Sequence, residues 1–129
     1  MENNINNHLS DGKLYCISIS NADNCEQAWD VVLMPDVIIG RDDTCHIQLF
    51  DKSISRQHCR IFYNGATMIE NLSKTNVAKL NGIVLSTPTG LEEGDRIECG
   101  RATLMVDSIY CSDTDESEVQ RSGTFYIDI

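Results

Sequence analysis

The chain has 129 residues and a formal net charge of −10, with ten Lys and Arg residues against twenty Asp and Glu residues. This length fits one domain with terminal segments, and it allows an ordinary hydrophobic core. General nucleic-acid binding and binding to an anionic membrane surface both depend on clustered Lys and Arg side chains. The acidic balance therefore predicts no nucleic acid and no membrane as partners.

Short apolar runs separated by turns dominate the first half of the chain. Residues 1–13 are polar and rich in Asn, which predicts a flexible N-terminal segment. A polar turn is expected over residues 21–27. Strands are expected at 14–20, 29–34, 37–39 and 47–50.

Two Asn-Gly pairs in the second half are typical of β-hairpins. Asn64-Gly65 separates the expected strands 58–63 and 66–72, and Asn81-Gly82 separates 78–80 and 83–85. Further strands are expected at 96–99 and 102–110. Many short strands without helical periodicity predict an all-β sandwich over residues 14–110. An acidic C-terminal tail follows at 111–129, and its strand-like segment 124–129 either adds to a sheet edge or stays unpaired.

The six cysteines show neither a C-x-x-C pair nor the Cys/His spacing of a zinc site. Four of them lie in or beside strand-like runs, which favours small buried side chains in a reducing compartment over disulfides or reactive thiols. The N-terminus has no signal-peptide pattern, and no apolar run has membrane-spanning length. We therefore expect a cytoplasmic protein without a metal or a cofactor.

A group of donor side chains stands out in this acidic sequence. Arg41 follows Gly40 at the end of an expected strand, and its planar guanidinium suits a bidentate grip on phosphate. Ser55-Arg56 and Thr75-Asn76 lie in turns and add hydroxyls, a second cation and a side-chain amide. This set matches the charge and the acceptor oxygens of a phosphorylated residue. Ordinary surface positions are the competing interpretation, since Arg and Ser are mostly exposed in any protein.

The order and spacing of four short motifs resemble the forkhead-associated (FHA) domain. The matching motifs are Gly40-Arg41, Ser55-Arg56-Gln57-His58, Thr75-Asn76 and Asn81-Gly82. The resemblance covers about residues 14–110. It implies a sandwich of about eleven short, mostly antiparallel strands, with loops at one end that bind phosphothreonine peptides in Ser/Thr kinase signalling or assembly.

The resemblance also implies a role for each matched residue. Arg41 and Ser55 would hold the phosphate, and Arg56 would contact the phosphate or the peptide nearby. Thr75 would shape the phosphothreonine slot, and Asn76 would bind the peptide backbone. Ser53 stands where family members vary their selection of a downstream peptide residue. Structural support of the loops would come from Gly40, His58, Asn81 and Gly82.

One departure from the family pattern keeps a second function open. Val77-Ala78 stands where the family usually has Gly-Thr, and a β-branched residue fits poorly wherever a positive φ is needed. The alternative is a phosphate-independent scaffold with a degenerate pocket. An enzyme is not expected, because the neighbours Cys45 and His46 would point to opposite faces of a strand.

The acidic tail adds one expectation about partners. Thr114 lies in the sequence S-D-T-D-E-S, and its phosphorylated form would be a ligand for the same pocket, in the same chain or in a second copy.

Overall fold

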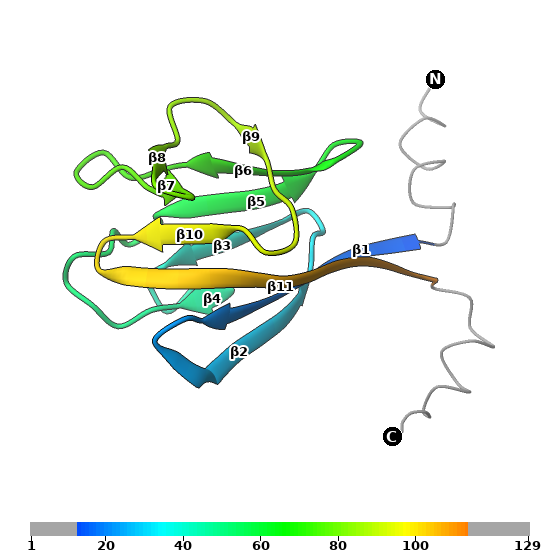
Figure 1. The fold of residues 1–129 in the computed structure, drawn as a ribbon, viewed down its shortest axis with the longest axis horizontal. Coiled ribbons are helices and arrows are strands. Elements are labelled where there is room, and N and C mark those ends of the chain that lie inside the picture. Colours follow the sequence, from blue (N-terminus) through cyan, green and yellow to red (C-terminus); the bar gives the residue numbers. More distant parts are fainter. Residues whose placement is uncertain (1–12, 114–129) are drawn as a thin grey trace.

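The computed structural model describes residues 13–113 of the chain, so the predictions for the first twelve residues and for 114–129, including the edge strand at 124–129, lie outside the described residues. The described residues form eleven β-strands and no helix. The strands make two sheets that pack face to face (Figure 1). The prediction of an all-β sandwich of about eleven strands is confirmed.

Six strands form the larger sheet. They are β1 (Lys13–Asn21), β2 (Asn24–Val32), β7 (Lys79–Leu80), β8 (Ile83–Val84), β10 (Arg96–Cys99) and β11 (Ala102–Asp113). Their order is β2-β1-β11-β10-β7-β8, and all neighbours are antiparallel. The long pairing between β1 and β11 runs from Lys13 opposite Asp113 to Asn21 opposite Leu104.

Five strands form the smaller sheet. They are β3 (Asp36–Gly40), β4 (Ile47–Gln48), β5 (Cys59–Tyr63), β6 (Thr67–Asn71) and β9 (Thr89–Gly90). Their order is β4-β3-β5-β6-β9. β3 and β4 are parallel, whereas the other neighbours are antiparallel.

Three differences between the expected and the observed strands have a clear physical reason. β2 already begins at Asn24, where a polar turn was expected, because this edge strand is largely exposed and tolerates polar residues. β11 continues beyond Tyr110 to Asp113, since β1 offers pairing partners as far as Lys13. β9 was not expected, because the Thr-Gly pair that forms it carries no apolar signal.

Branched aliphatic side chains from both sheets fill the core. Ile17 and Ile19 of β1 face Ile39 of β3 and Ile61 of β5 in one cluster, and all four are fully buried. Alternating burial along β5 and β6 matches the period of two expected for strands with one face on the core. All six cysteines are free thiols, and three of the four cysteines expected inside are buried, while Cys45 is half-buried.

The two ends of the sandwich are built differently. One end, here called the loop end, carries the connections 41–46, 49–58, 72–78 and 100–101 and lies on the left of Figure 1. The opposite end, here called the turn end, carries the tight turns 64–66 and 91–95. The start of β5 lies beside the ends of β3 and β6, which brings three long loops together. Within residues 13–113 there is no helix that could cross a membrane.

Candidate functional site

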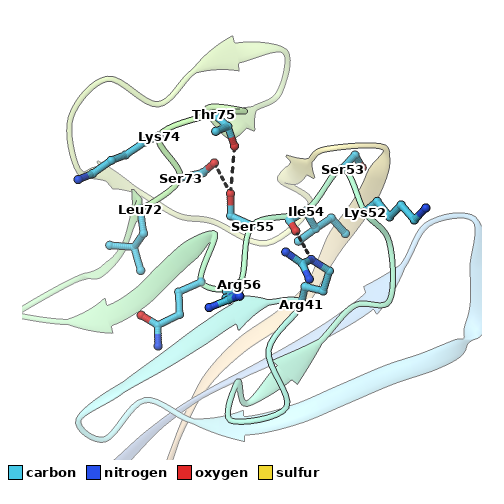
Figure 2. A pocket seen from close by; sticks show the side chains of 11 residues that line it. Arg41, Lys52, Ser53, Ile54, Ser55, Arg56, Leu72, Ser73, Lys74 and Thr75 are labelled. Carbon is cyan, nitrogen blue, oxygen red and sulfur yellow. Dashed lines mark hydrogen bonds between the residues drawn. The ribbon is translucent and has the colours of Figure 1, made fainter.

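Three loops at the loop end surround an open hollow (Figure 2). The hollow is lined by Arg41, Lys52, Ser53, Ile54, Ser55, Arg56, Gln57, Leu72, Ser73, Lys74 and Thr75. Four of the five residues expected to bind the phosphopeptide therefore come together here, although they belong to three different loops. The fifth, Asn76, lines an adjoining hollow that also includes Ser53 and Thr75.

Arg41 is held in place by the β4–β5 loop. Its backbone N–H donates to the Ser55 carbonyl at 2.9 Å, and its Nε donates to the Ile54 carbonyl at 2.8 Å. The Nε bond fixes the direction of the guanidinium, which leaves the terminal nitrogens for a ligand. Arg41 is exposed, and no carboxylate within residues 13–113 forms an ion pair with it.

Gly40 allows the β3 and β4–β5 backbones to approach closely. A Cβ at this position would collide with the carbonyl oxygen of Arg56 and would lie 2.9 Å from the Cα of Gln57. The neighbouring Asp42 N–H donates to the same Arg56 carbonyl at 3.1 Å. Glycine is thus needed here for close contact between two loops, with no need for a positive φ.

Three hydroxyl groups form a cluster beside Arg41. Ser55 Oγ lies 2.6 Å from Ser73 Oγ and 3.4 Å from Thr75 Oγ1 (Figure 2). Ser73 also accepts the backbone N–H of Asn76 at 3.1 Å. The cluster therefore joins the β4–β5 loop to the β6–β7 loop, with Thr75 exposed and Ser73 buried.

His58 lies beneath the hollow and is fully buried. Its Nδ1 accepts the backbone N–H of Ser55 at 3.0 Å, so it positions the loop that carries the Ser55 hydroxyl. Burial lowers the pKa of His58, and an interaction with the backbone of Asn76 opposes this shift only in part. A neutral ring with a proton on Nε2 fits this arrangement, because Nδ1 must act as an acceptor.

Asn76 and Ser53 join the β6–β7 loop to the loops below it. Asn76 Nδ2 donates to the Ser53 carbonyl at 2.9 Å. The Ser53 hydroxyl donates to Asp51 Oδ1 at 2.7 Å and accepts the Arg101 N–H at 2.9 Å. Bonds from the Ser53 backbone, the Ser53 hydroxyl and the Arg101 side chain lower the pKa of Asp51 to about 2. The Ser53 hydroxyl, at the position predicted to select a downstream peptide residue, is therefore already hydrogen-bonded within the protein.

The departure at Val77 is accommodated by the backbone. Asn81 is the sole non-glycine residue with a positive φ in the described part of the chain, so Val77 adopts an ordinary conformation. Val77 is exposed, and Ala78 is buried with its N–H donating to Asn71 Oδ1 at 2.9 Å. A valine therefore fits this turn without the strain that the family pattern led us to expect.

Asn81 and Gly82 lie away from the hollow. They form the turn between β7 and β8, with φ values of 53° and 85°. Asn81 Nδ2 donates to Asp95 Oδ1 at 3.0 Å, and its Oδ1 accepts the Arg96 N–H at 2.9 Å. These bonds connect the β7–β8 turn to the start of β10. A substitution of Asn81 could therefore affect the hollow only through the larger sheet.

The hollow is strongly cationic in an acidic protein. Four basic side chains line it, and no Asp or Glu does so: Arg41, Lys52, Arg56 and Lys74. On the smaller sheet, by contrast, a basic side chain is neutralised by ion pairs. Arg60 is paired with Asp36 at 2.8 Å and with Glu70 at 2.6 Å. Within residues 13–113 no cluster of His, Cys, Asp and Glu side chains fits a metal ion. The arrangement suits the binding of an anion.

Sequence reasoning missed part of the lining. Lys52, Ser73 and Lys74 were not singled out as lining residues. The available signal was proximity, because each of them lies within three residues of a matched motif position. Which side chains of these loops turn inward depends on loop contacts that no periodicity reveals.

The fold and the site together define a class of protein: a β-sandwich domain whose loop end carries a cationic hollow suited to an anionic ligand. Residues 37–100 of the chain match the family model of the FHA domain. Together with the sandwich architecture, this match shows that the chain contains an FHA domain.

Several known proteins are similar to this chain. The proliferation marker protein Ki-67 of Homo sapiens is 34% identical over 61 residues, which cover 46% of this chain but only 2% of Ki-67. The FHA domain of an Arabidopsis thaliana hypothetical protein has a TM-score of 0.66 at 25% identity, over 74% of this chain and 86% of its own. An FHA domain studied for phosphothreonine-dependent interactions has a TM-score of 0.65 at 24% identity, over 71% of this chain and 95% of its own.

Proposed function

We propose that this chain is a non-enzymatic binding module that recognises phosphothreonine on a protein partner, in Ser/Thr kinase signalling or assembly. The observation that carries the proposal is the hollow itself, with four cations, four hydroxyls and no carboxylate among its lining residues, and three of the hydroxyls in one cluster. Such a surface in a chain of net charge −10 suits a compact anion better than an extended polyanion.

Each part of the hollow has a role in this proposal. The terminal nitrogens of Arg41 hold two phosphate oxygens, because its Nε is already committed to Ile54. Ser55 and Thr75 donate hydroxyl protons to the phosphate, while Arg56 adds charge from the same loop. A phosphate of about −1.5 to −2 charges is matched by this set. Asn76 Oδ1 stays available to accept a peptide N–H, since its Nδ2 is bound to Ser53.

Binding to a phosphothreonine peptide library tests the proposal, read by fluorescence anisotropy. We expect the wild-type protein to select phosphorylated peptides and Arg41→Ala to lose that selection with little change in melting temperature. Arg60→Ala is the matched control, because it removes an arginine that is paired with Asp36 and Glu70 on the sheet. Equal binding of wild type and Arg41→Ala would refute the proposed function.

A phosphate-independent scaffold is the second candidate. The observation in its favour is an exposed apolar group around the edge strand β8, where Ile83, Val84 and Val77 are 72%, 50% and 42% exposed. Exposed apolar patches on folded proteins often mark protein–protein interaction sites. A partner captured equally well by wild type and Arg41→Ala, but lost by Ile83→Ser, would favour the scaffold.

We also propose that phosphorylated Thr114 is a ligand only for a second copy of the chain. Thr114 follows Asp113, the last residue of the 12-residue strand β11. This strand begins beside Arg101, which is bonded to Ser53 at the loop end, and it runs away from that end for roughly 36 Å at about 3.3 Å per residue. The length of β11 therefore opposes binding within one chain.

Light scattering of the phosphorylated chain tests this self-association. We expect head-to-tail oligomers of the chain phosphorylated at Thr114, and monomers of its Thr114→Ala and Arg41→Ala variants. A monomeric phosphorylated chain at high micromolar concentration would exclude it.

We also propose that the protein is cytoplasmic. Its support is the set of six free thiols, which is typical of a reducing compartment. Microscopy of a fluorescent fusion tests it.

A further inference from the structure

Ser73 is an unusual part of the loop end because it is a serine with only 4% exposure. Serine side chains are mostly exposed, and a buried hydroxyl needs partners for its proton and its lone pairs. Ser73 Oγ has two such partners, the backbone N–H of Asn76 at 3.1 Å and Ser55 Oγ at 2.6 Å. No ligand role follows from the family motifs for this position.

The direction of the two hydrogen bonds follows from the chemistry of the groups. A backbone N–H can only donate, so Ser73 Oγ must accept the bond from Asn76. The hydroxyl proton of Ser73 then needs an acceptor, and within the described residues that acceptor is Ser55 Oγ. The reverse direction would leave the buried Ser73 proton without an acceptor, which is costly. Ser73 therefore donates to Ser55.

This direction determines what Ser55 can offer. Its oxygen accepts from Ser73, and its backbone N–H is used by His58 Nδ1 at 3.0 Å. Its own hydroxyl proton is then free to point toward Thr75 Oγ1, 3.4 Å away, or into the hollow. A phosphate without acidic protons requires donors, so a Ser55 hydroxyl turned the other way would repel it.

We propose that Ser73 is a positioning residue that fixes the Ser55 hydroxyl as a donor to the phosphate. The proposal rests on the proposed function, since it assigns Ser73 to the same site. Ser73 itself stays buried below the hydroxyl cluster and acts through Ser55. Its bond to the Asn76 N–H also lets the β6–β7 loop set the orientation of a side chain on the β4–β5 loop.

A double-mutant cycle tests this coupling with one phosphothreonine peptide selected by the wild-type protein. The variants are Ser73→Ala, Ser55→Ala and the double variant, measured for peptide affinity and for melting temperature. We expect Ser73→Ala to weaken binding about three- to tenfold in the wild-type background and to change it less than about twofold in the Ser55→Ala background. The melting temperature should fall in both backgrounds, because the Asn76 N–H loses its acceptor either way.

The outcomes separate a positioning role from a purely structural one. An equal loss of affinity in both backgrounds, or no loss at all, would overturn the role of Ser73 while the phosphate preference of the wild type still stood. A wild type that binds no better than Arg41→Ala would instead overturn the proposed function, and the role of Ser73 with it. If Ser73→Ala does not fold, Ser73→Cys serves in its place, since a thiol keeps the size but is a weaker donor and acceptor.

Discussion

The loop end and the turn end of the sandwich use glycine for different physical reasons. At the turn end, Gly65 and Gly94 have φ values of 104° and 91°, and the space where a Cβ would stand is open. At the loop end, a Cβ on Gly40 would collide with the Arg56 backbone, and one on Gly100, which also has a positive φ of 56°, would collide with Ser53. The turn end thus requires a backbone conformation alone, whereas the loop end also requires segments distant in sequence to lie in contact.

This difference shows how the loop end can be rigid without regular secondary structure. Arg41 is bonded to the backbone of the next loop, His58 supports Ser55 from below, and Asn76 reaches across to Ser53. The Arg41 and Asn76 contacts each join two separate loops, whereas the His58 contact supports the β4–β5 loop from within. A site whose donors are already in place loses less conformational entropy when a ligand binds. The predictions below test this contrast between the two ends.

Gly40→Ala should have the largest effect. The added methyl group meets backbone atoms of Arg56 that no rotamer change can move, so β3 and the β4–β5 loop must separate. We expect a loss of about 3 kcal/mol or more in the free energy of unfolding, as for severe overpacking, together with loss of phosphopeptide binding. Urea denaturation and anisotropy measure the two effects.

Gly65→Ala is the matched control at the turn end. Its methyl group enters open space, so only the positive φ of 104° is costly. We expect a loss of about 1 to 2 kcal/mol in stability and unchanged peptide affinity. If Gly40→Ala and Gly65→Ala changed the peptide affinity equally, the proposed difference between the loop end and the turn end would be wrong.

His58→Ala comes next, because it removes a fully buried ring and leaves the Ser55 N–H without its acceptor. We expect a loss of about 2 to 3 kcal/mol in the free energy of unfolding. The stability should also depend on pH. The folded-state pKa of His58 lies below its usual 6.5, so the unfolded chain binds a proton first as the pH falls.

The His58 contribution is therefore complete above about pH 6.5 and decreases as the pH falls from there toward the lower, folded-state pKa. Urea denaturation at pH 7.5 and pH 5 should show a larger loss for wild type than for His58→Ala. An identical loss in both proteins would show that folding does not lower the pKa of His58.

Much of this structure could be predicted from the sequence, for identifiable reasons. The alternation in residues 59–63 and the Asn-Gly pair that follows are local signals, and β5, β6 and their turn appear where expected. The prediction of a turn over residues 21–27 was wrong from Asn24 onward, because an exposed edge strand can have the polar composition of a turn. The motif residues Arg41, Ser55 and Thr75 were placed in one site through their resemblance to a family, since no period connects them.

The contacts between the loops could not be predicted. The burial of Ser73 depends on the path of the β6–β7 loop, which its own residues do not determine. The partner of Gly40 is the backbone of Arg56, and a backbone carbonyl carries no sequence signal. Val77 was expected to strain its turn, yet its backbone is ordinary.

The smallest loss of stability is expected for substitutions of two asparagines, Asn76 and Asn81. Each of them connects two segments by hydrogen bonds, but at different places in the sandwich. Asn76 Nδ2 donates to the Ser53 carbonyl at the loop end, and Asn81 bonds to Asp95 and to the Arg96 N–H beside the turn end. Asn76→Ala and Asn81→Gly should each lower the free energy of unfolding by about 1 kcal/mol, because the lost bonds are exposed. Glycine at position 81 keeps the positive φ of 53° without strain.

Only the loop-end substitution should change binding. Asn76→Ala removes an amide that fixes the β6–β7 loop and faces the peptide, so we expect affinity for a phosphothreonine peptide to fall by about tenfold, or about 1.4 kcal/mol. Asn81→Gly should leave the affinity within about twofold, since its bonds end at β10 and not at the hollow. A comparable loss for Asn81→Gly would mean that the six-stranded sheet transmits changes to the loop end, and that the two ends are not independent.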